Sequence, residues 1–344
     1  MDGPAAIDSS LIDQAARRLL EGGLVAFPTE TVFGLGADAE NPAAVARIYA
    51  AKQRPAGHPL IVHIAPGADL LWWADSVPPA ARALADAFCP GPLTLILPRA
   101  ARIPPAVSGG HATIGVRCPS HPVAQALLTR FAALKPGGQG GVAAPSANKF
   151  GQVSPTHAEH VRSEFPELGP SELLILDGEP ATVGIESTIV DVSDPSGHVA
   201  ILRPGHIGPE QIAAVLGVMP GWGGKASPQV SGSLKAHYAP RTPLYLVAAE
   251  QLESVLDDFM DGHDGDVPRR VAALVFQAPS QPHEGVDYHP AERDAHDYAR
   301  HLYATLRRLD NQGYDALVIE SPPDAPEWHA VRDRLRRAAA AFDG

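Results

Sequence analysis

The chain has 344 residues, 45% of them hydrophobic, which is enough for two domains and at least one large buried core. Its formal net charge of −12 opposes indiscriminate binding to nucleic acids or anionic membranes, because such binding depends on cationic side chains. There is no apolar run of about eighteen residues and no signal-peptide pattern at the N-terminus, so we expect a cytoplasmic protein that does not enter membranes.

The cysteine and histidine patterns give no sign of a structural metal. Cys89 and Cys118 are the only cysteines, which excludes a disulfide framework and a four-cysteine site and favours two free thiols. The 15 histidines are scattered, and no His-Glu-x-x-His motif occurs. We therefore predict no metal ligands among the side chains.

Helices and strands alternate along the first two thirds of the chain, which indicates an α/β fold. The predicted helices span residues 9–21, 42–52, 80–88, 121–133 and 209–216. The predicted strands span residues 24–27, 59–64, 93–97, 113–117, 142–144, 173–176, 188–192 and 199–202. Because several strands follow one another without a helix, we expect a mixed twisted sheet with some antiparallel pairs.

A second, smaller domain is predicted after a segment rich in Pro, Gly and Ser. The predicted division is a first domain at 8–218, a linker at 219–241 that closes over the site, and a second domain at 242–344. In the second domain, strands at 244–248, 271–276 and 316–320 alternate with helices at 250–261, 291–311 and 326–342, the pattern of a small parallel, Rossmann-like sheet. No Gly-x-Gly-x-x-Gly follows its strands, so nothing indicates a dinucleotide.

Cationic and hydroxyl side chains gather at the predicted strand ends of the first domain, where ligands of α/β sheets bind. Residues 241–344 hold 11 Lys and Arg against 19 Asp and Glu, so an anionic ligand is expected in the first part of the chain. The pattern suits a polyphosphate held by side chains, since the usual Gly-x-x-x-x-Gly-Lys loop is absent. These residues are Thr29, Thr31, Lys52, Arg54, His63, Thr113, Arg117, Ser146, Asn148, Ser187, Thr188 and Arg203.

Two carboxylates, Glu30 and Glu186, lie among these residues and allow more than one interpretation. They could form a general acid/base pair or hold Mg²⁺ against a nucleotide, and the spacing does not decide between these roles. Turn capping or indirect metal contact is favoured, because the nearby cations indicate an anionic ligand. A serine nucleophile is disfavoured, because no Gly-x-Ser-x-Gly elbow occurs and Ser146 follows a proline.

Seven motifs in order across residues 10–217 resemble those of the YrdC-like L-threonylcarbamoyladenylate synthases. They are Pro28-Thr29-Glu30-Thr31-Val32-Phe33-Gly34-Leu35-Gly36, Lys52-Gln53-Arg54-Pro55, Pro90-Gly91-Pro92-Leu93-Thr94, Val116-Arg117-Cys118-Pro119, Pro145-Ser146-Ala147-Asn148, Glu186-Ser187-Thr188-Ile189-Val190-Asp191 and Leu202-Arg203-Pro204-Gly205. The linker ending in His237-Tyr238-Ala239-Pro240, with the trailing α/β domain, is similar to the longer, two-domain branch of that family.

The resemblance implies a nucleotidyltransferase that converts L-threonine, bicarbonate or CO2, and ATP into L-threonylcarbamoyladenylate and pyrophosphate. The product would serve the threonylcarbamoyl modification of a tRNA adenosine near the anticodon. Mg²⁺ would accompany ATP, the product would be handed to a tRNA threonylcarbamoyl transferase complex, and direct tRNA binding would be weak. The chemistry would depend on positioning and charge neutralisation more than on a covalent nucleophile.

The resemblance also implies residue roles. L-Threonine would be bound by Thr31, His63, Arg117, the Ala144 backbone and Ser187. ATP would be bound by Arg54, His58, Thr113, Ser146, Ser154, Arg203 and Tyr238, and the catalytic set would be Lys52, Arg54, Ser146 and Asn148. The glycines of the first motif would let the backbone approach the ligand.

This chain departs from the family pattern at four places. Phe33 replaces a tyrosine, His58 stands where asparagine is common, and Phe150 replaces a small residue. The linker segment 231–236 also differs from the usual Pro-Gly-Met-Lys sequence. The contacts of His58, Ser154 and Tyr238 with ATP are the roles that these departures put in question.

Two other functions share some of these sequence features. A double-stranded-RNA or tRNA-binding module could use the same Arg and Lys residues for phosphates, although the acidity of the chain argues against it. A carbamoyl-transfer component of hydrogenase maturation would need zinc-finger cysteines and an acylphosphatase segment, which the sequence lacks.

Overall fold

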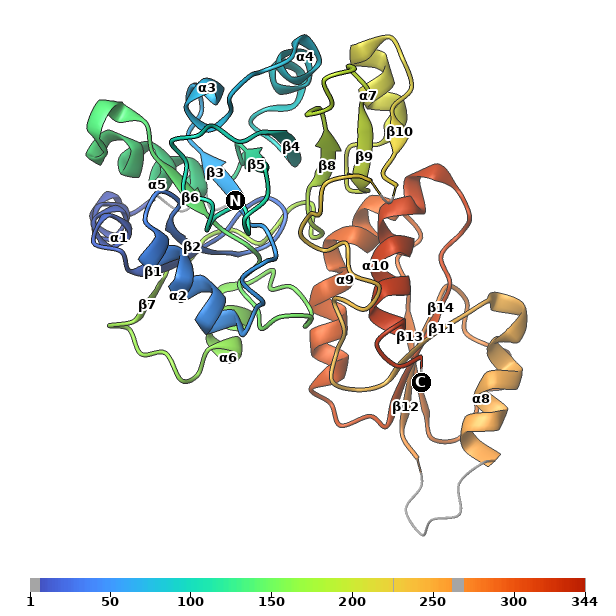
Figure 1. The fold of residues 1–344 in the computed structure, drawn as a ribbon. Helices are drawn as coiled ribbons and strands as arrows, with labels where there is room; N and C mark the ends of the chain where they lie inside the picture. Colours follow the sequence, from blue (N-terminus) through green and yellow to red (C-terminus); the bar gives the residue numbers. More distant parts are fainter. Residues whose placement is uncertain (1–6, 225, 262–268, 344) are drawn as a thin grey trace. The chain divides into compact units, whose positions relative to one another are not determined.

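The computed structural model describes residues 7–224, 226–261 and 269–343 (Figure 1). The chain separates into two compact units, the first comprising 1–150 and 154–233 and the second comprising 151–153 and 234–344. The segment that was predicted as a linker, 219–241, is thus divided between the units after Ser233. Each unit has its own sheet.

The first unit is built on a ten-stranded mixed sheet with the strand order β10-β9-β8-β4-β5-β3-β6-β2-β1-β7. Strands β3 and β5 run parallel, whereas β4 pairs with β5 and β8 with β9 in antiparallel fashion, so the prediction of a mixed sheet is confirmed. The strands are β1 (Leu24–Phe27), β2 (Gly34–Asp38), β3 (Ile61–Ile64), β4 (Leu93–Pro98), β5 (Thr113–Arg117), β6 (Gly141–Ala143), β7 (Leu173–Ile175), β8 (Thr188–Asp191), β9 (Ala200–Arg203) and β10 (Gly221–Trp222).

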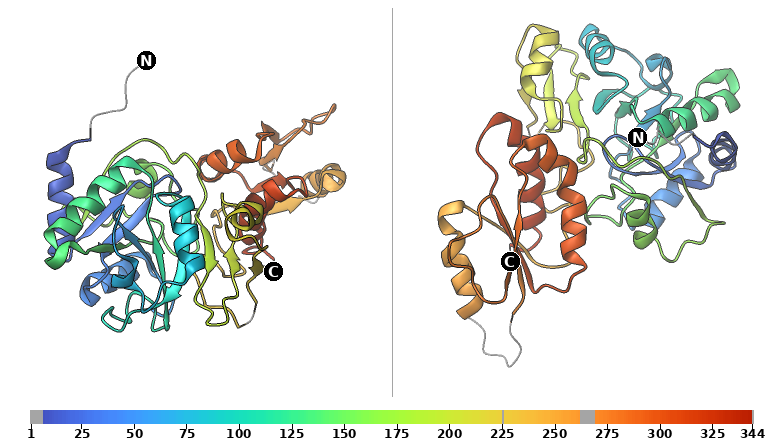
Figure 2. Two further views of the ribbon diagram at one scale, coloured as in Figure 1. Left: turned by 90° about the horizontal axis from the view of Figure 1, so that it is seen from above. Right: turned by 180° about the vertical axis from the view of Figure 1, so that it is seen from behind.

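Helices cover both faces of this sheet. Their bounds are α1 (Ser9–Leu20), α2 (Pro42–Lys52), α3 (Leu70–Trp73), α4 (Pro79–Phe88), α5 (Pro122–Leu134), α6 (Ala158–Glu164) and α7 (Pro209–Leu216). Helices α1 and α5 pack together over β1, β2 and β6, and share a core that includes Phe27, Leu127 and Phe131. The larger core lies on the opposite face, beneath α2 and α4, and α4 lies beside α7 in Figure 2.

One further part of the sheet is covered by irregular chain rather than by a helix. Val230 packs on Ile96 of β4 and Ile189 of β8, on the same face of the sheet as Ile61 and Leu202. The face that carries Ile61 also carries His63, because side chains two residues apart on a strand point the same way. The predicted site residues of β3 and β5 therefore lie on the face between α5 and the segment around Val230.

The second unit is a four-stranded sheet with the order β11-β14-β12-β13, and all of its pairs are parallel, as predicted. Its strands are β11 (Leu244–Val247), β12 (Val271–Val275), β13 (Val286–Pro290) and β14 (Ala316–Glu320), and its helices are α8 (Leu252–Asp261), α9 (Ala295–Asp310) and α10 (His329–Ala339). Helix α8 lies on one side of these strands, with α9 and α10 on the other (Figure 1). No helix in the described part of the chain is long and apolar enough to cross a membrane.

Five short strands and α-helices were not predicted. Strands β2, β10 and β13 and helices α3 and α6 follow segments rich in Gly, Pro or polar residues, which sequence patterns assign to loops. Strand β2 has the largest consequence, because it places Gly34 and Gly36 inside the sheet. A Cβ atom on Gly36 would lie 2.7 Å from Val142 Cγ1 and 2.8 Å from Phe27 Cε1. The expectation that this glycine leaves room for a ligand was therefore wrong, since neighbouring side chains fill the space.

Candidate active site

The register of β3 and β5 places His63 directly beside Arg117 at the ends of two parallel strands. Both side chains are buried, at 3% and 5% exposure. Burial, and then the charge of Arg117, lower the pKa of His63 to about 3, so its imidazole is neutral at physiological pH. A neutral histidine next to a fixed cation can form a hydrogen bond with a polar ligand without adding positive charge.

Arg117 forms a buried ion pair with Glu30, whose role the sequence patterns leave open. Arg117 Nη2 donates to Glu30 Oε1 at 2.7 Å, and the backbone N–H of Ser120 donates to Glu30 Oε2 at 3.1 Å. Arg117 Nε is buried and has no hydrogen-bond partner among the described residues. The pair therefore leaves at least one guanidinium donor for a ligand.

The turn between β1 and β2 is held by the hydroxyl of Thr29. This hydroxyl donates to the Val32 carbonyl at 2.6 Å and accepts from the Thr31 and Val32 amides at 3.2 Å each. The hydroxyls of Thr29 and Thr31 lie 2.9 Å apart, and both residues are fully buried. The hydroxyl of Thr29 therefore caps this turn and fixes Thr31 in place.

Helix α2 ends at Lys52, and Gln53 after it adopts a left-handed conformation with φ of 53°. The ammonium of Lys52 donates to the carbonyls of Ser146, at 2.6 Å, and of Asn148. Burial and the charge of Arg54 lower the pKa of Lys52 well below its usual value. In this structure Lys52 therefore holds the loop that carries Ser146 and Asn148.

Arg54 and His58 are joined by Phe150, one of the departures from the family pattern. The Arg54 guanidinium lies over the Phe150 ring at 5.5 Å, and the His58 ring meets the same ring edge-on at 5.2 Å. Burial, and then the charges of Arg54 and His111, lower the pKa of His58, which favours its neutral form. Two departures from the pattern, at His58 and Phe150, thus form one contact.

Segment 229–233, which belongs to the first unit, contacts three residues of the predicted ATP set. Arg203 Nη1 donates to the Ser231 carbonyl at 2.9 Å, and Arg54 Nη2 lies 3.5 Å from Ser231 Oγ. Gln229 Nε2 lies 3.5 Å from His58 Nδ1. The first part of the predicted linker therefore contacts side chains that are predicted to bind ATP.

Arg203 also reaches Ser187, a residue of the predicted threonine set. Its Nη2 donates to Ser187 Oγ at 3.1 Å and to the Ser187 carbonyl at 3.0 Å. Ser187 Oγ lies 2.8 Å from Thr94 Oγ1, a contact that the sequence did not reveal. One arginine therefore connects the residues that were predicted for the two substrates.

The remaining predicted residues lie in several places. The hydroxyl of Ser154 donates to Glu186 Oε1 at 2.6 Å, the Ala144 amide donates to Ile61 of β3 at 3.0 Å, and Thr113 begins β5. Tyr238 belongs to the second unit, where it packs against Tyr303 and under the guanidinium of Arg334. Glu30 thus contacts Arg117, and Glu186 contacts Ser154.

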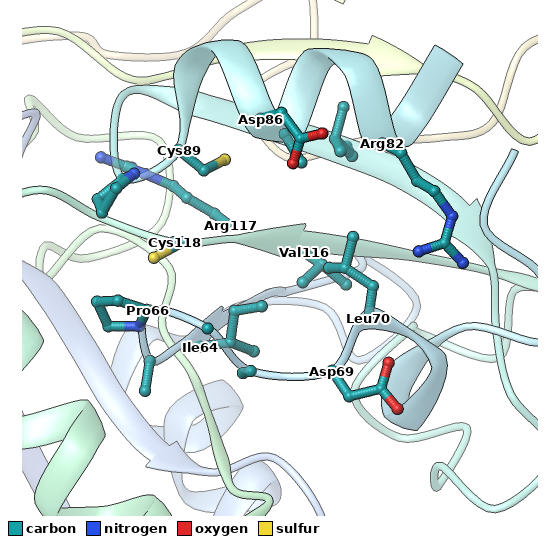
Figure 3. Close-up of a pocket in the computed structure, with 16 residues that line it drawn as sticks. Ile64, Pro66, Asp69, Leu70, Arg82, Asp86, Cys89, Val116, Arg117 and Cys118 are labelled. Atoms are coloured by element: carbon teal, nitrogen blue, oxygen red, sulfur yellow. The ribbon is translucent and has the colours of Figure 1, made fainter. Parts of the chain in front are cut away.

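A cavity of about 470 Å³ opens at the ends of β3 and β5, on the side of α4. Cys89, Arg117 and Cys118 gather at one end of it, and Asp69 and Arg82 lie at the other (Figure 3). Both thiols are free, and burial raises the pKa of both, to about 12 for Cys118. Of the predicted site residues, Arg117 alone lines this cavity.

Two family models match the chain. The Sua5/YciO/YrdC model, described as telomere recombination, matches residues 17–205, and the model of the threonylcarbamoyl-AMP synthase C-terminal domain matches residues 207–340. The chain is 39% identical to the threonylcarbamoyl-AMP synthase of Bacillus subtilis over 337 residues, which cover 95% of this chain and 92% of the relative. The chain belongs to the threonylcarbamoyl-AMP synthases.

Other relatives agree with this family membership. The threonylcarbamoyl-AMP synthase of Pyrococcus abyssi is 35% identical over 340 residues, which cover 94% of this chain and 93% of the relative. A crystal structure of P. abyssi Sua5 complexed with L-threonine matches with a TM-score of 0.82 and 33% identity, covering 97% of this chain and 95% of that one. These matches include both domains, as expected of the longer branch of the family.

Proposed function

We propose that this chain synthesises L-threonylcarbamoyl-AMP from L-threonine, bicarbonate or CO2, and ATP, and releases pyrophosphate. Membership of the synthase family supports the reaction. The single structural observation that carries the assignment is the pair of hydrogen bonds from Arg203. One is donated to Ser187, a predicted threonine ligand, and the other to Ser231, which also contacts Arg54 of the predicted ATP set. The reaction needs these two substrates to lie side by side.

In the proposed mechanism, threonine enters as a zwitterion and its ammonium group first loses a proton to solvent. The neutral amine then attacks CO2, loses a second proton to solvent and becomes a carbamate. A carbamate oxygen then forms a bond to the α-phosphorus of ATP, while the bond from that phosphorus to the bridging oxygen breaks and pyrophosphate leaves. Neither step needs a protein nucleophile, so the chain contributes orientation and charge neutralisation.

The residue roles follow from this scheme. Arg117 would bind the threonine carboxylate, with Thr31, His63, the Ala144 backbone and Ser187 around the rest of the molecule. Arg54, His58, Thr113, Ser146, Ser154, Arg203 and Tyr238 would bind ATP. Lys52 and Asn148 would act at the phosphates or, as their contacts suggest, by holding the loop of Ser146.

The residues present fit Mg²⁺ only as an ion brought by ATP. The described part of the chain contains no group of three or more His, Cys, Asp or Glu side chains that could hold a metal. Glu186 accepts a hydrogen bond from Ser154, and Glu30 is paired with Arg117. The phosphates and water would therefore supply most ligands, as Mg²⁺ commonly accepts, and the ion would neutralise charge on the leaving pyrophosphate.

We further propose that the chain works in the cytoplasm and hands its product to a transferase that modifies tRNA. Direct recognition of tRNA is not required by this scheme, and the net charge of −12 does not favour it.

The experiment that tests the proposal measures pyrophosphate release from ATP with each substrate omitted in turn. We expect release that requires both threonine and bicarbonate. ATP turnover that is indifferent to threonine would contradict the proposed substrate, and tight, salt-sensitive tRNA binding without any affinity for ATP or threonine would favour an RNA-binding role instead.

A further inference from the structure

We infer that Glu30 is a positioning residue that aims Arg117 at the carboxylate of the amino-acid substrate. The inference rests on the proposed function, in which Arg117 binds that carboxylate. Glu30 is 4% exposed and Arg117 is 5% exposed, and the 2.7 Å contact between them joins the β1–β2 turn to the end of β5. These two residues come from segments that are 87 positions apart in the sequence.

Glu30 is itself held at several points. Its Oε1 accepts from Arg117, its Oε2 accepts from the Ser120 amide at 3.1 Å, and its backbone carbonyl accepts from the Val183 amide at 2.7 Å. Because both carboxylate oxygens are used by different segments, the carboxylate has one orientation. The guanidinium of Arg117 binds one of these oxygens and is planar and rigid, so it is held in one orientation as well.

The unpartnered donor of Arg117 shows what the pair leaves available. Arg117 Nε is buried and has no hydrogen-bond partner among the described residues, whereas buried polar atoms usually have one. A carboxylate is the acceptor that matches an arginine fork best. Glu30 therefore binds Nη2 of Arg117 and leaves Nε for the carboxylate of the substrate.

The charges of the site support the same role. Glu30 compensates Arg117, and the neighbouring His63 is neutral because burial lowers its pKa to about 3. The three side chains therefore carry no net charge. A zwitterionic amino acid can enter such a site without leaving an uncompensated charge, whereas a simple anion would leave one.

The test compares L-threonine with L-threoninol, which has a hydroxymethyl group in place of the carboxylate, by isothermal titration. Wild-type protein should bind threonine more tightly than threoninol. In Glu30→Gln, which keeps the size of the side chain but removes its charge, threonine affinity should fall by roughly tenfold to a hundredfold, as for loss of a charged hydrogen bond. Threoninol affinity should stay within about twofold, since Arg117 does not bind its hydroxymethyl group.

Glu186→Gln is the matched control, because Glu186 is also a buried carboxylate at the site but accepts from Ser154 instead of Arg117. This variant should leave the preference for threonine over threoninol unchanged. In steady-state assays, Glu30→Gln should raise the KM for threonine much more than the KM for ATP, and Glu186→Gln should do the reverse.

The outcomes separate the inference from the proposed function. Equal losses of threonine and threoninol affinity in Glu30→Gln, or no loss of either, would overturn the positioning role alone. Failure of the wild-type protein to bind threonine would overturn the proposed function and this inference together. If Glu30→Gln does not fold, Glu30→Asp keeps the charge but shortens the reach; a preference for threonine that stays at the wild-type value in this variant would also overturn the inference.

Discussion

The two halves of the proposed site are held in different ways. In the threonine half, Arg117, His63 and Thr31 are fixed by strand register, by the buried ion pair with Glu30 and by the hydroxyl of Thr29. In the ATP half, Arg54, Arg203 and His58 contact Ser231 and Gln229, which lie on irregular chain outside any helix or strand. The threonine half is therefore preformed. In the ATP half, some hydrogen-bond donors of Arg54 and Arg203 contact Ser231 of the protein itself.

This difference has a consequence for the order of events at the site. A ligand of the threonine half can add to donors such as Arg117 Nε without breaking a described contact. A nucleotide that binds Arg203 Nη1 and Arg54 Nη2 would compete with Ser231, because both groups contact that residue. We therefore expect ATP, and not threonine, to displace segment 229–233.

The largest effect is expected from Arg117→Ala, which removes the buried ion pair of the threonine half. Removal of the guanidinium leaves Glu30 buried without its cation, which should lower the free energy of unfolding by about 3–5 kcal/mol in a denaturant titration. Arg130→Ala is the control, because Arg130 pairs with Asp13 at the surface and should change stability little. Equal stability losses in the two variants would show that the buried pair has no special role.

Lys52→Met should lower kcat by roughly tenfold to a thousandfold, since it removes the amine that is proposed to act at the phosphates and releases the loop of Ser146 and Asn148. Threonine affinity should be retained, because Lys52 has no described contact with that half. Lys135→Met, which removes an ammonium paired with Asp38 and Glu40, is the matched control and should keep its kcat. Normal turnover by Lys52→Met would contradict the catalytic role of this lysine.

The pH dependence of stability should report on His63. Its pKa is about 3 in the folded chain and about 6.5 when unfolded, so the unfolded state binds more protons between these values and stability falls as pH falls. Between pH 7 and pH 5 this residue should contribute a loss of about 2 kcal/mol in unfolding free energy. In His63→Gln, the free energy of unfolding should depend less steeply on pH over this range. An unchanged slope would show that another group is responsible for the pH dependence.

A smaller effect is expected in the ATP half from Phe150→Ala. The variant loses the ring over which the Arg54 guanidinium lies and which His58 meets edge-on, a cation–π contact that contributes about 0.5–1 kcal/mol. ATP affinity should fall by about twofold to fivefold in a titration, with threonine affinity unchanged. A loss of threonine affinity as large as that of ATP would contradict the separation of the two halves.

The sequence predicted most of the fold because its apolar runs and caps are clear. The predicted helix at 42–52 coincides with α2, where Asn41 accepts from two backbone amides and Pro42 occupies the first turn. Strand β2 was missed because Gly34 and Gly36 are typical of turns, and their place in the sheet depends on the packing of Phe27 and Val142. That packing involves segments far apart in the chain, which local patterns do not reveal.

The same limit applies to the site. The motifs identified which residues gather there, but the partner of each one depends on tertiary structure. The sequence does not reveal the role of Glu30 because its partner, Arg117, lies 87 residues away. It also does not reveal that the rings of Phe150 and His58 contact each other. The contacts of Ser231 and Gln229 could not be foreseen either, since the composition of that segment indicates only irregular chain.

Amide hydrogen exchange of segment 229–233 tests the difference between the two halves most directly. The protein is compared alone, with threonine and with a non-hydrolysable ATP analogue. We predict that the ATP analogue changes the exchange of this segment, whereas threonine leaves it as it is in the free protein. A change of equal size with threonine alone, or no change with the ATP analogue, would contradict the account.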